Sequence, residues 1–187
     1  MKILVAGLGN IGEEYRNTRH NAGFMIVDYL AAQYKIEFSS GRYAFYTELK
    51  VKNKVITLIK PSTYMNLSGK AVAYWMKKIG VSIENLLVVV DDIALPAGKV
   101  RIKTKGGDGG HNGLIDITEH LNSNNFCRLR FGAGNDFFPG QQADYVLSKW
   151  PDDELQMLNE KIKLAADAVV CWALEGVEQA MTKFNNN

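Results

Sequence analysis

Residues 86–92, LLVVVDD, carry the clearest indication of the fold. Five consecutive apolar residues without alternation predict a strand that is buried on both faces, as central parallel strands are. The run ends in Asp91 and Asp92, and α/β proteins place functional groups at the carboxyl ends of such strands. The sequence therefore predicts an α/β protein, with Asp91 as a candidate functional group. The alternative is that the two aspartates only form a turn.

The sequence on both sides of this strand predicts further strands and helices. Further strands are predicted at residues 3–8, 43–51, 55–60, 99–105 and 126–132, with a hairpin around residues 52–54. Apolar residues at helical spacing predict helices at residues 22–30, 72–79 and 114–121 and a long helix at about 151–183, followed by a frayed tail, 185–187. We expect one domain, residues 1–187, folded as an α/β/α sandwich around a mixed, mostly parallel twisted sheet.

The composition excludes several classes of protein. The 187 residues are 47% hydrophobic and 22% charged, which is typical of a globular protein and excludes wholesale disorder. Two cysteines do not make a disulfide scaffold, and no apolar run of membrane-spanning length is present. The first apolar run is too short for a secretory signal, so we expect a cytoplasmic protein. Residues 1–150 carry a net charge of +6 and residues 151–187 carry −4, which hints at a polyanionic partner.

Residues 7–12, GLGNIG, fit the glycine pattern of dinucleotide-binding proteins. That interpretation requires a helix to open at the third glycine, but residues 13–21 show no helical period and begin with two glutamates. A nicotinamide-dependent oxidoreductase is therefore a weak alternative. A second glycine cluster, residues 106–113, lacks the Gly-Lys-Ser/Thr ending of a nucleotide-binding loop.

Basic residues recur at every second position in the predicted strand 99–105. This spacing places Lys99, Arg101, Lys103 and Lys105 on one face of the strand, and Arg128 and Arg130 repeat the pattern on strand 126–132. A solvated face that deters edge-to-edge aggregation is one interpretation. Because no acidic residue interrupts residues 99–105, we favour a surface that binds phosphates.

The histidines point to acid–base chemistry rather than to zinc. No spacing typical of a zinc site occurs, and Cys127 and Cys171 are most simply core thiols. His20 is the histidine that lies in a polar segment soon after the first strand. An imidazole oriented by a carboxylate is an effective general base, and Asp91 is a candidate for that carboxylate. Spacing alone does not pair the two residues.

Several motifs together resemble those of bacterial peptidyl-tRNA hydrolase. They are GLGN at 7–10, Tyr15, NTRHNAG at 17–23, PSTYMNLSG at 61–69, DD at 91–92 before LPAG at 95–98, GGHNGL at 109–114 and RLRFG at 128–132. Their order and spacing match the family over residues 2–150. The family cleaves the ester between a nascent peptide and the terminal ribose of tRNA, and it thereby recycles tRNA from stalled ribosomes.

The resemblance implies a role for each matching residue. His20 is the expected general base that activates water, Asp91 holds its imidazole, and Asn10 and Asn66 grip the peptide backbone and the acceptor end. Asn112 contacts tRNA and helps to position the water. From the chemistry of amide side chains we further expect that either Asn10 or Asn112 stabilises the oxyanion. The remaining expected residues are Tyr15 and Tyr64 beside the tRNA end and Lys103, Lys105 and Arg130 on the basic tRNA face.

The resemblance also implies the context of the reaction. We expect no cofactor, no metal, no membrane and a monomer. The expected partners are the acceptor stem and 3′ end of peptidyl-tRNA and, in addition, the large subunit of a stalled ribosome. Three positions depart from the family pattern: Ile11 where proline is common, Tyr64 where phenylalanine is common, and Asp108 in the glycine loop. A non-catalytic RNA-binding protein on the same fold is the main alternative.

Overall fold

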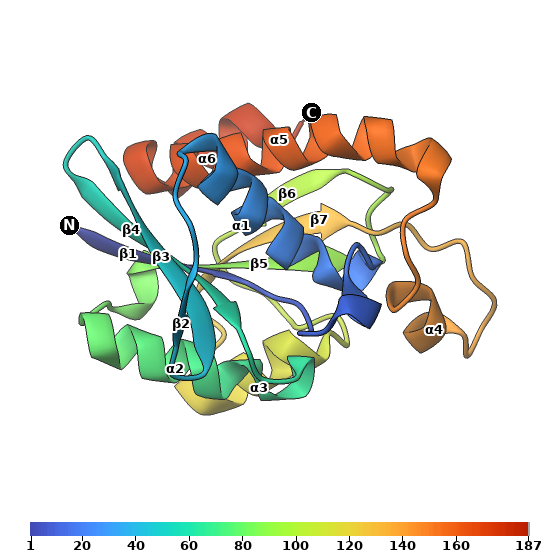
Figure 1. The fold of residues 1–187 in the computed structure, drawn as a ribbon, viewed down its shortest axis with the longest axis horizontal. Helices are drawn as coiled ribbons and strands as arrows, with labels where there is room; N and C mark the ends of the chain where they lie inside the picture. The colour runs from blue at the N-terminus through green and yellow to red at the C-terminus, as the bar shows by residue number, and fades with distance from the viewer. Residues whose placement is uncertain (187) are drawn as a thin grey trace.

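A twisted sheet of seven strands runs through the protein (Figure 1). The computed structural model describes residues 1–186. The strand order is β2-β3-β4-β1-β5-β7-β6, with bounds β1 Lys2–Gly7, β2 Ser39–Gly41, β3 Ala44–Val51, β4 Lys54–Pro61, β5 Leu86–Asp92, β6 Val100–Lys103 and β7 Cys127–Gly132. The four adjacent strands β4, β1, β5 and β7 are parallel, and β2, β3 and β6 pair antiparallel at the two edges. The prediction of a mixed α/β sheet is confirmed, and its parallel part is confined to the centre.

Helices cover both faces of the sheet (Figure 1). One face packs against α1 Ala22–Gln33, α5 Asp152–Glu175 and α6 Val177–Phe184, and the other packs against α2 Ser68–Ile79 and α3 Asn112–Leu121. Alternate residues of β5 point to opposite faces, so that Leu87 and Val89 enter one core and Val88 and Val90 the other. Burial on both faces explains the uninterrupted apolar run of this strand.

Short helices connect these elements. They are the 3₁₀ turns η1 Glu13–Tyr15, η2 Arg19–Asn21, η3 Met65–Leu67 and η4 Ile83–Asn85, and the five-residue helix α4 Gln142–Val146. None of the helices that the structure describes is long and apolar enough to cross a membrane.

The first glycine motif packs a strand against a helix. No α-helix opens at Gly12, because η1 and η2 intervene before α1 begins at Ala22. A Cβ atom on Gly7 would clash with the carbonyl oxygen of Gly23 in α1, and one on Gly9 would meet the ring of Phe24 at 2.7 Å. The structure therefore contradicts the nicotinamide-binding interpretation, because no α-helix opens at the third glycine and the first turn of α1 is packed directly against the motif, where Phe24 N–H donates to the Leu8 carbonyl at 3.2 Å.

Two predicted boundaries are wrong. The strand expected at 99–105 ends at Lys103, because the chain then bends into the glycine loop. The long C-terminal helix expected at about 151–183 is two helices, since Gly176 adopts φ 90° and ψ 171° between α5 and α6. Only glycine takes up such a backbone conformation readily.

The predicted frayed tail is also wrong at Asn185. Its side chain accepts a hydrogen bond from the Ile102 N–H at 2.6 Å and donates one to the Ile102 carbonyl at 3.0 Å. The amide thus pairs with the outer edge of β6 as a neighbouring strand would, and it closes that edge. Residue 187 lies outside the described residues.

Replacing Asn185 by alanine should lower the free energy of unfolding by about 1–3 kcal/mol, because the two polar groups of Ile102 lose their partners. Urea unfolding followed by circular dichroism measures the change. Asn186→Ala is the matched control and should leave the unfolding midpoint unchanged. Equal midpoints for all three proteins would show that the edge pairing contributes nothing.

Candidate active site

A cleft of about 850 Å³ opens at the carboxyl ends of the parallel strands. Loops after β1, β4, β5 and β7, the glycine loop before α3, and α4 form its walls. The cleft brings together residues that lie far apart in the sequence. Among its lining residues are eight of the ten that the sequence analysis selected: Asn10, Tyr15, His20, Tyr64, Asn66, Asp91, Asn112 and Arg130.

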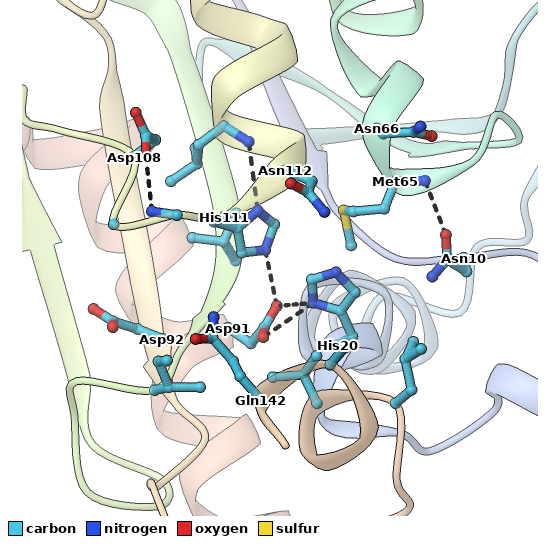
Figure 2. A pocket seen from close by; sticks show the side chains of 18 of the residues that line it. Asn10, His20, Met65, Asn66, Asp91, Asp92, Asp108, His111, Asn112 and Gln142 are labelled. Atoms are coloured by element: carbon cyan, nitrogen blue, oxygen red, sulfur yellow. Dashed lines mark hydrogen bonds and ion pairs between the residues drawn. The ribbon is translucent and has the colours of Figure 1, made fainter. Parts of the chain in front are cut away.

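His20 and Asp91 form a hydrogen-bonded pair in this cleft, although 71 residues separate them in the chain. The Nδ1 atom of His20 lies 2.9 Å and 3.1 Å from the two oxygens of Asp91. The Asp91 side chain, at the end of β5, is only 3% exposed, and that of His20, in η2, is 11% exposed. An Nδ1–H that donates to the carboxylate leaves Nε2 as the basic atom. Figure 2 shows the pair side by side in the cleft.

A second imidazole, His111, binds the same carboxylate. Its Nε2 atom lies 2.9 Å from Oδ1 of Asp91. Its Nδ1 atom accepts hydrogen bonds from the backbone N–H groups of Gly113 and Leu114 at the start of α3, at 3.2 Å and 3.4 Å. An acceptor Nδ1 carries no proton, so Nε2–H is the donor to Asp91. His111 is thus both the N-cap of α3 and a support for Asp91.

The two histidines set the ionisation of Asp91. Burial by itself would raise the pKa of the Asp91 carboxyl, but the interactions with His111 and His20 outweigh burial and hold the pKa well below its usual range. The carboxylate is therefore ionised throughout the neutral range, and it favours the imidazole orientation in which Nδ1 of His20 faces it.

His111 was not selected from the sequence, and Asn112 was the one residue of the glycine loop that received a role. The available signal was a histidine directly before a helical stripe, in the N-cap position that serine, threonine, aspartate or asparagine usually fills. Its pairing with Asp91 has no sequence signal, because the two residues meet only through the fold.

Ligand atoms of His20, Asp91 and His111 lie within 4.8 Å of one another, as metal ligands do. The hydrogen bonds do not suit a metal. The lone pair on Nδ1 of His111 already accepts from two backbone N–H groups, which keeps the proton on Nε2. Both atoms that face the carboxylate are thus hydrogen-bond donors, and a metal would require His111 to give up its contacts with α3.

Asn10 is held in one orientation from two sides. Its Oδ1 accepts from the Met65 N–H at 2.9 Å, which leaves the NH₂ group as the available end of the amide. Asn21, the neighbour of His20, exchanges two hydrogen bonds with the backbone of Asn10, at 2.8 Å and 2.9 Å. The segment that carries the imidazole therefore also fixes the segment that carries the amide. Asn21 was not selected from the sequence.

The chain is similar to known proteins over nearly its whole length. A family model described as peptidyl-tRNA hydrolase matches residues 4–187. The chain is 49% identical to a peptidyl-tRNA hydrolase of Bacteroides fragilis and 51% identical to one of Cytophaga hutchinsonii, and each alignment covers 99% of this chain and at least 98% of the relative. The structure matches a crystal structure of peptidyl-tRNA hydrolase from Acinetobacter baumannii with a TM-score of 0.92 at 37% identity, over 98% of this chain and 94% of that chain.

The chain belongs to the peptidyl-tRNA hydrolase family. The resemblance seen in the sequence motifs is thereby confirmed, and so is the α/β fold that it implied.

In this family member, the residues expected to bind substrate lie around the cleft mouth. Tyr64 is 64% exposed, Asn66 and Asn112 are exposed, and Tyr15 is partly exposed. Within residues 1–186, no hydrogen bond occupies the side chains of Tyr64, Asn66 or Asn112. These side chains are therefore available to a bound molecule.

The basic residues divide into two groups that the alternating pattern did not separate. Lys103 on β6 and Lys105 after it are exposed and lie outside the cleft. Arg130 lines the cleft, where it pairs with Asp92 at 3.2 Å and donates to the Gly107 carbonyl at 2.7 Å.

Arg128, which the pattern placed on the same basic face, is fully buried. It donates to the carbonyls of Gly106, Gly107 and Asn124 at 2.8–3.0 Å, and burial lowers its pKa to about 10. The prediction that Arg128 adds to an exposed basic face is wrong, because the glycine loop folds back over this part of β7. Arg128 and Arg130 instead hold the loop that carries His111.

The residue before His20 anchors the opposite wall of the cleft. Arg19 is 7% exposed, and its guanidinium lies 4.3 Å from the ring centre of Tyr145 and 5.1 Å from that of Trp150. It donates to the Ser148 hydroxyl at 2.6 Å and to the Lys149 carbonyl at 3.0 Å. These contacts hold the segment of α4 against η2.

His111→Ala removes one of the two imidazoles that lower the pKa of Asp91. An ionised Asp91 stabilises the fold above its unfolded pKa of about 4, and this stabilisation is lost as the pH falls through the lower folded-state pKa. Because the folded-state pKa rises in the variant, H111A should unfold at a higher pH than the parent in an acid titration followed by circular dichroism. kcat should also fall by about ten-fold or more, since a hydrogen bond to a charged group contributes about 1.5–3 kcal/mol.

The control for this prediction is His120→Ala. The His120 side chain is 39% exposed and pairs with Asp116, so it does not support Asp91. H120A should keep the parental acid midpoint and kcat. A parental midpoint and kcat in H111A would remove His111 from the support of Asp91.

Proposed function

We propose that this chain hydrolyses the ester between a nascent peptide and the terminal ribose of tRNA, with His20 as the general base. The observation that carries the proposal is the His20–Asp91 pair in the cleft of a member of the peptidyl-tRNA hydrolase family. Peptidyl-tRNA that leaves stalled ribosomes early is the expected source of substrate, and release of the peptide recycles the tRNA.

The proposed reaction begins with a water molecule at Nε2 of His20. The imidazole removes a proton from the water as its oxygen attacks the ester carbonyl carbon, which gives a tetrahedral oxyanion. Collapse of this intermediate breaks the bond to the ribose oxygen, and the protonated His20 returns a proton to that leaving group. The peptide leaves as a carboxylic acid and the tRNA keeps its terminal hydroxyl. Asp91 stabilises the positive imidazolium while it exists.

Amide groups around this pair suit the remaining tasks. Asn10 offers a fixed NH₂ group, since its oxygen is held by Met65, and a preorganised donor of this kind stabilises an oxyanion by about 10²–10³-fold in rate. Between Asn10 and Asn112, this fixed orientation favours Asn10 for the oxyanion. Asn66 and Asn112 both donate and accept, so they suit a peptide backbone of any sequence and the acceptor end.

The tRNA is assigned to the cleft mouth and to the edge at β6. Tyr15 and Tyr64 offer rings beside the cleft for the unpaired 3′ end, because bases stack on aromatic side chains. Lys103 and Lys105 supply positive charge for the phosphates of the acceptor stem, a contact that reads no sequence. Arg130 serves the tRNA face indirectly, since Asp92 and Gly107 already occupy its guanidinium.

The cellular setting follows from the same proposal. Rescue of tRNA from stalled ribosomes places the enzyme in the cytoplasm, with the large ribosomal subunit as a further partner. We retain the expectations of a monomer that needs neither metal nor cofactor. The alternative, a non-catalytic RNA-binding protein, is not favoured, because His20, Asp91 and the three asparagines are all present in one cleft.

Activity is tested with an N-acetyl-aminoacyl-tRNA beside the same tRNA that carries a free amino group, both in the presence of a chelator. We expect rapid cleavage of the blocked ester alone. His20→Ala should lower turnover by about 10²-fold or more and leave tRNA affinity near normal, whereas His120→Ala should behave as the parent. Parental turnover in H20A would overturn the general-base assignment, and tight tRNA binding without cleavage by the parent would favour the RNA-binding alternative.

The basic edge is tested by the double variant Lys103→Ala, Lys105→Ala. It should raise KM for the blocked substrate and reduce the salt dependence by about two phosphate contacts, with kcat near the parental value. The double variant Lys35→Ala, Lys52→Ala removes two exposed lysines elsewhere and serves as the control. A fall in kcat with unchanged KM would show that the tRNA does not lie on this edge.

A further inference from the structure

A second positive surface lies across the cleft from β6. It is built from Arg42 and Tyr43, in the turn between β2 and β3, and from Lys70, Tyr74 and Lys78 on α2, and we call it the α2 surface. The turn lies at the same sheet edge as the cleft, since β3 begins opposite the end of β4 with Ala44 paired to Pro61. The backbone N–H of Ser62 donates to the Tyr43 carbonyl at 2.9 Å, two residues before Tyr64 at the cleft mouth.

Tyr43 adopts a backbone conformation that disfavours a large side chain. Its φ is 64°, in the left-handed region, which costs residues other than glycine roughly 1–2 kcal/mol and which asparagine tolerates best among the others. Helix α2 fixes this turn, because the Nε1–H group of Trp75 donates to the Arg42 carbonyl at 2.9 Å. The fold thus holds an aromatic ring where a smaller residue suits the backbone better, and strain of this kind is found at functional sites.

Long cationic side chains surround this ring. The Arg42 guanidinium lies 5.0 Å from the ring centre of Tyr43, and the Lys70 ammonium lies 4.6 Å from it. Arg42 also donates to the Tyr43 hydroxyl at 3.1 Å, and this contact, with the charge of Lys70, lowers the pKa of the phenol. Farther along α2, Lys78 lies 4.3 Å from the ring centre of Trp75 and 5.9 Å from that of Tyr74.

The cations of the α2 surface have no acidic partner. Arg42, Lys70 and Lys78 are exposed, and within residues 1–186 none of them forms an ion pair. Lys70, Tyr74 and Lys78 are spaced by four residues, so cation, ring and cation follow one another along one side of α2 at steps of about 6 Å. Within the described residues, no carboxylate forms an ion pair with this line of positive charge.

We propose that the α2 surface binds single-stranded RNA, with Tyr43 stacking on a base and Arg42, Lys70 and Lys78 meeting phosphates. Cations that alternate with aromatic rings are the pattern of proteins that bind single strands, because every base offers a face for stacking. Lys70 is long and flexible, so a base can displace it from the ring while its ammonium moves to a phosphate. An acidic peptide would use the cations but not the ring.

The α2 surface lies toward the sheet edge formed by β2 and β3, on the same side of the cleft as β4. Strand β6 forms the opposite edge of the sheet. An acceptor stem on β6 therefore leaves the α2 surface free. The single strand is either part of the substrate tRNA or a separate RNA, and kinetics distinguish the two sources. This inference rests on the surface itself and does not require the proposed catalytic roles.

The test uses a fluorescein-labelled 12-nucleotide RNA of mixed sequence, with binding measured by anisotropy at low salt. Arg42→Gln with Lys70→Gln should weaken binding by about ten-fold and flatten its salt dependence. The control, Lys35→Gln with Lys52→Gln, removes the same charge elsewhere and should leave the affinity within about two-fold. Tyr43→Asn, which suits the turn, should weaken binding by about five-fold or more through the loss of stacking.

Hydrolysis of N-acetyl-aminoacyl-tRNA by the same variants identifies the source of the RNA. A raised KM in the Arg42, Lys70 variant supports a contact with the substrate tRNA. Parental KM together with lost binding of the 12-mer supports a separate RNA. A protein that hydrolyses nothing but still binds the 12-mer through these residues supports the inference while the proposed function fails.

Two results would overturn the inference. One is equal affinity for the 12-mer in the parent, the α2-surface variants and the lysine control, which would leave the cluster with a structural role only. The other is binding of a 12-residue poly-glutamate peptide as tight as that of the RNA, lost with Arg42 and Lys70 but unaffected by Tyr43→Asn. Circular dichroism of each variant confirms that it is folded.

Discussion

The site depends on one buried charge, the carboxylate of Asp91. A carboxylate with 3% exposure is costly to bury unless its oxygens are hydrogen-bonded, and both partners here are imidazoles from other parts of the chain. His20 arrives from the turn before α1, and His111 arrives from the glycine loop before α3. Asp91 is thus the point at which three loops of the sheet edge meet, and it holds them in register while it orients the imidazole of His20.

The two imidazoles have different duties because their second nitrogens have different neighbours. Nδ1 of His111 accepts hydrogen bonds from the first N–H groups of α3, so the role of this histidine is structural. Nε2 of His20 faces the cleft and has no such partner within the described residues (Figure 2). The same arrangement explains why the triad does not suit a metal: its nitrogens are donors toward the carboxylate. An imidazole held in one orientation by an ionised carboxylate agrees with the general-base role that we propose for His20.

The fold and the candidate pair His20–Asp91 could be predicted from the sequence, whereas the residues that surround and support this pair could not. Strand β5 could be predicted because its burial on both faces requires an uninterrupted run of apolar residues. The position of Asp91 at the end of the strand follows from this run. Arg128 was misplaced because a period of two fixes which face a residue points to but not what covers that face. The glycine loop covers it through backbone carbonyls. His111, Asn21 and Asn185 act through contacts 11 to 83 residues away, and no local pattern encodes such pairing.

Arginines hold the glycine loop beside the cleft, whereas lysines lie on the exposed surfaces of β6 and α2, and this division has a physical reason. The terminal nitrogens of Arg128 and Arg130 donate to carbonyls and to Asp92 in fixed geometry, which suits the planar fork of arginine. Within the described residues, the exposed lysines of β6 and α2 form no ion pairs, which suits the contacts with phosphates that we propose for them. A substrate that is the same at its ester but varies in tRNA and peptide needs this division. Rigid contacts belong where the chemistry is constant, and mobile charges belong where the ligand changes.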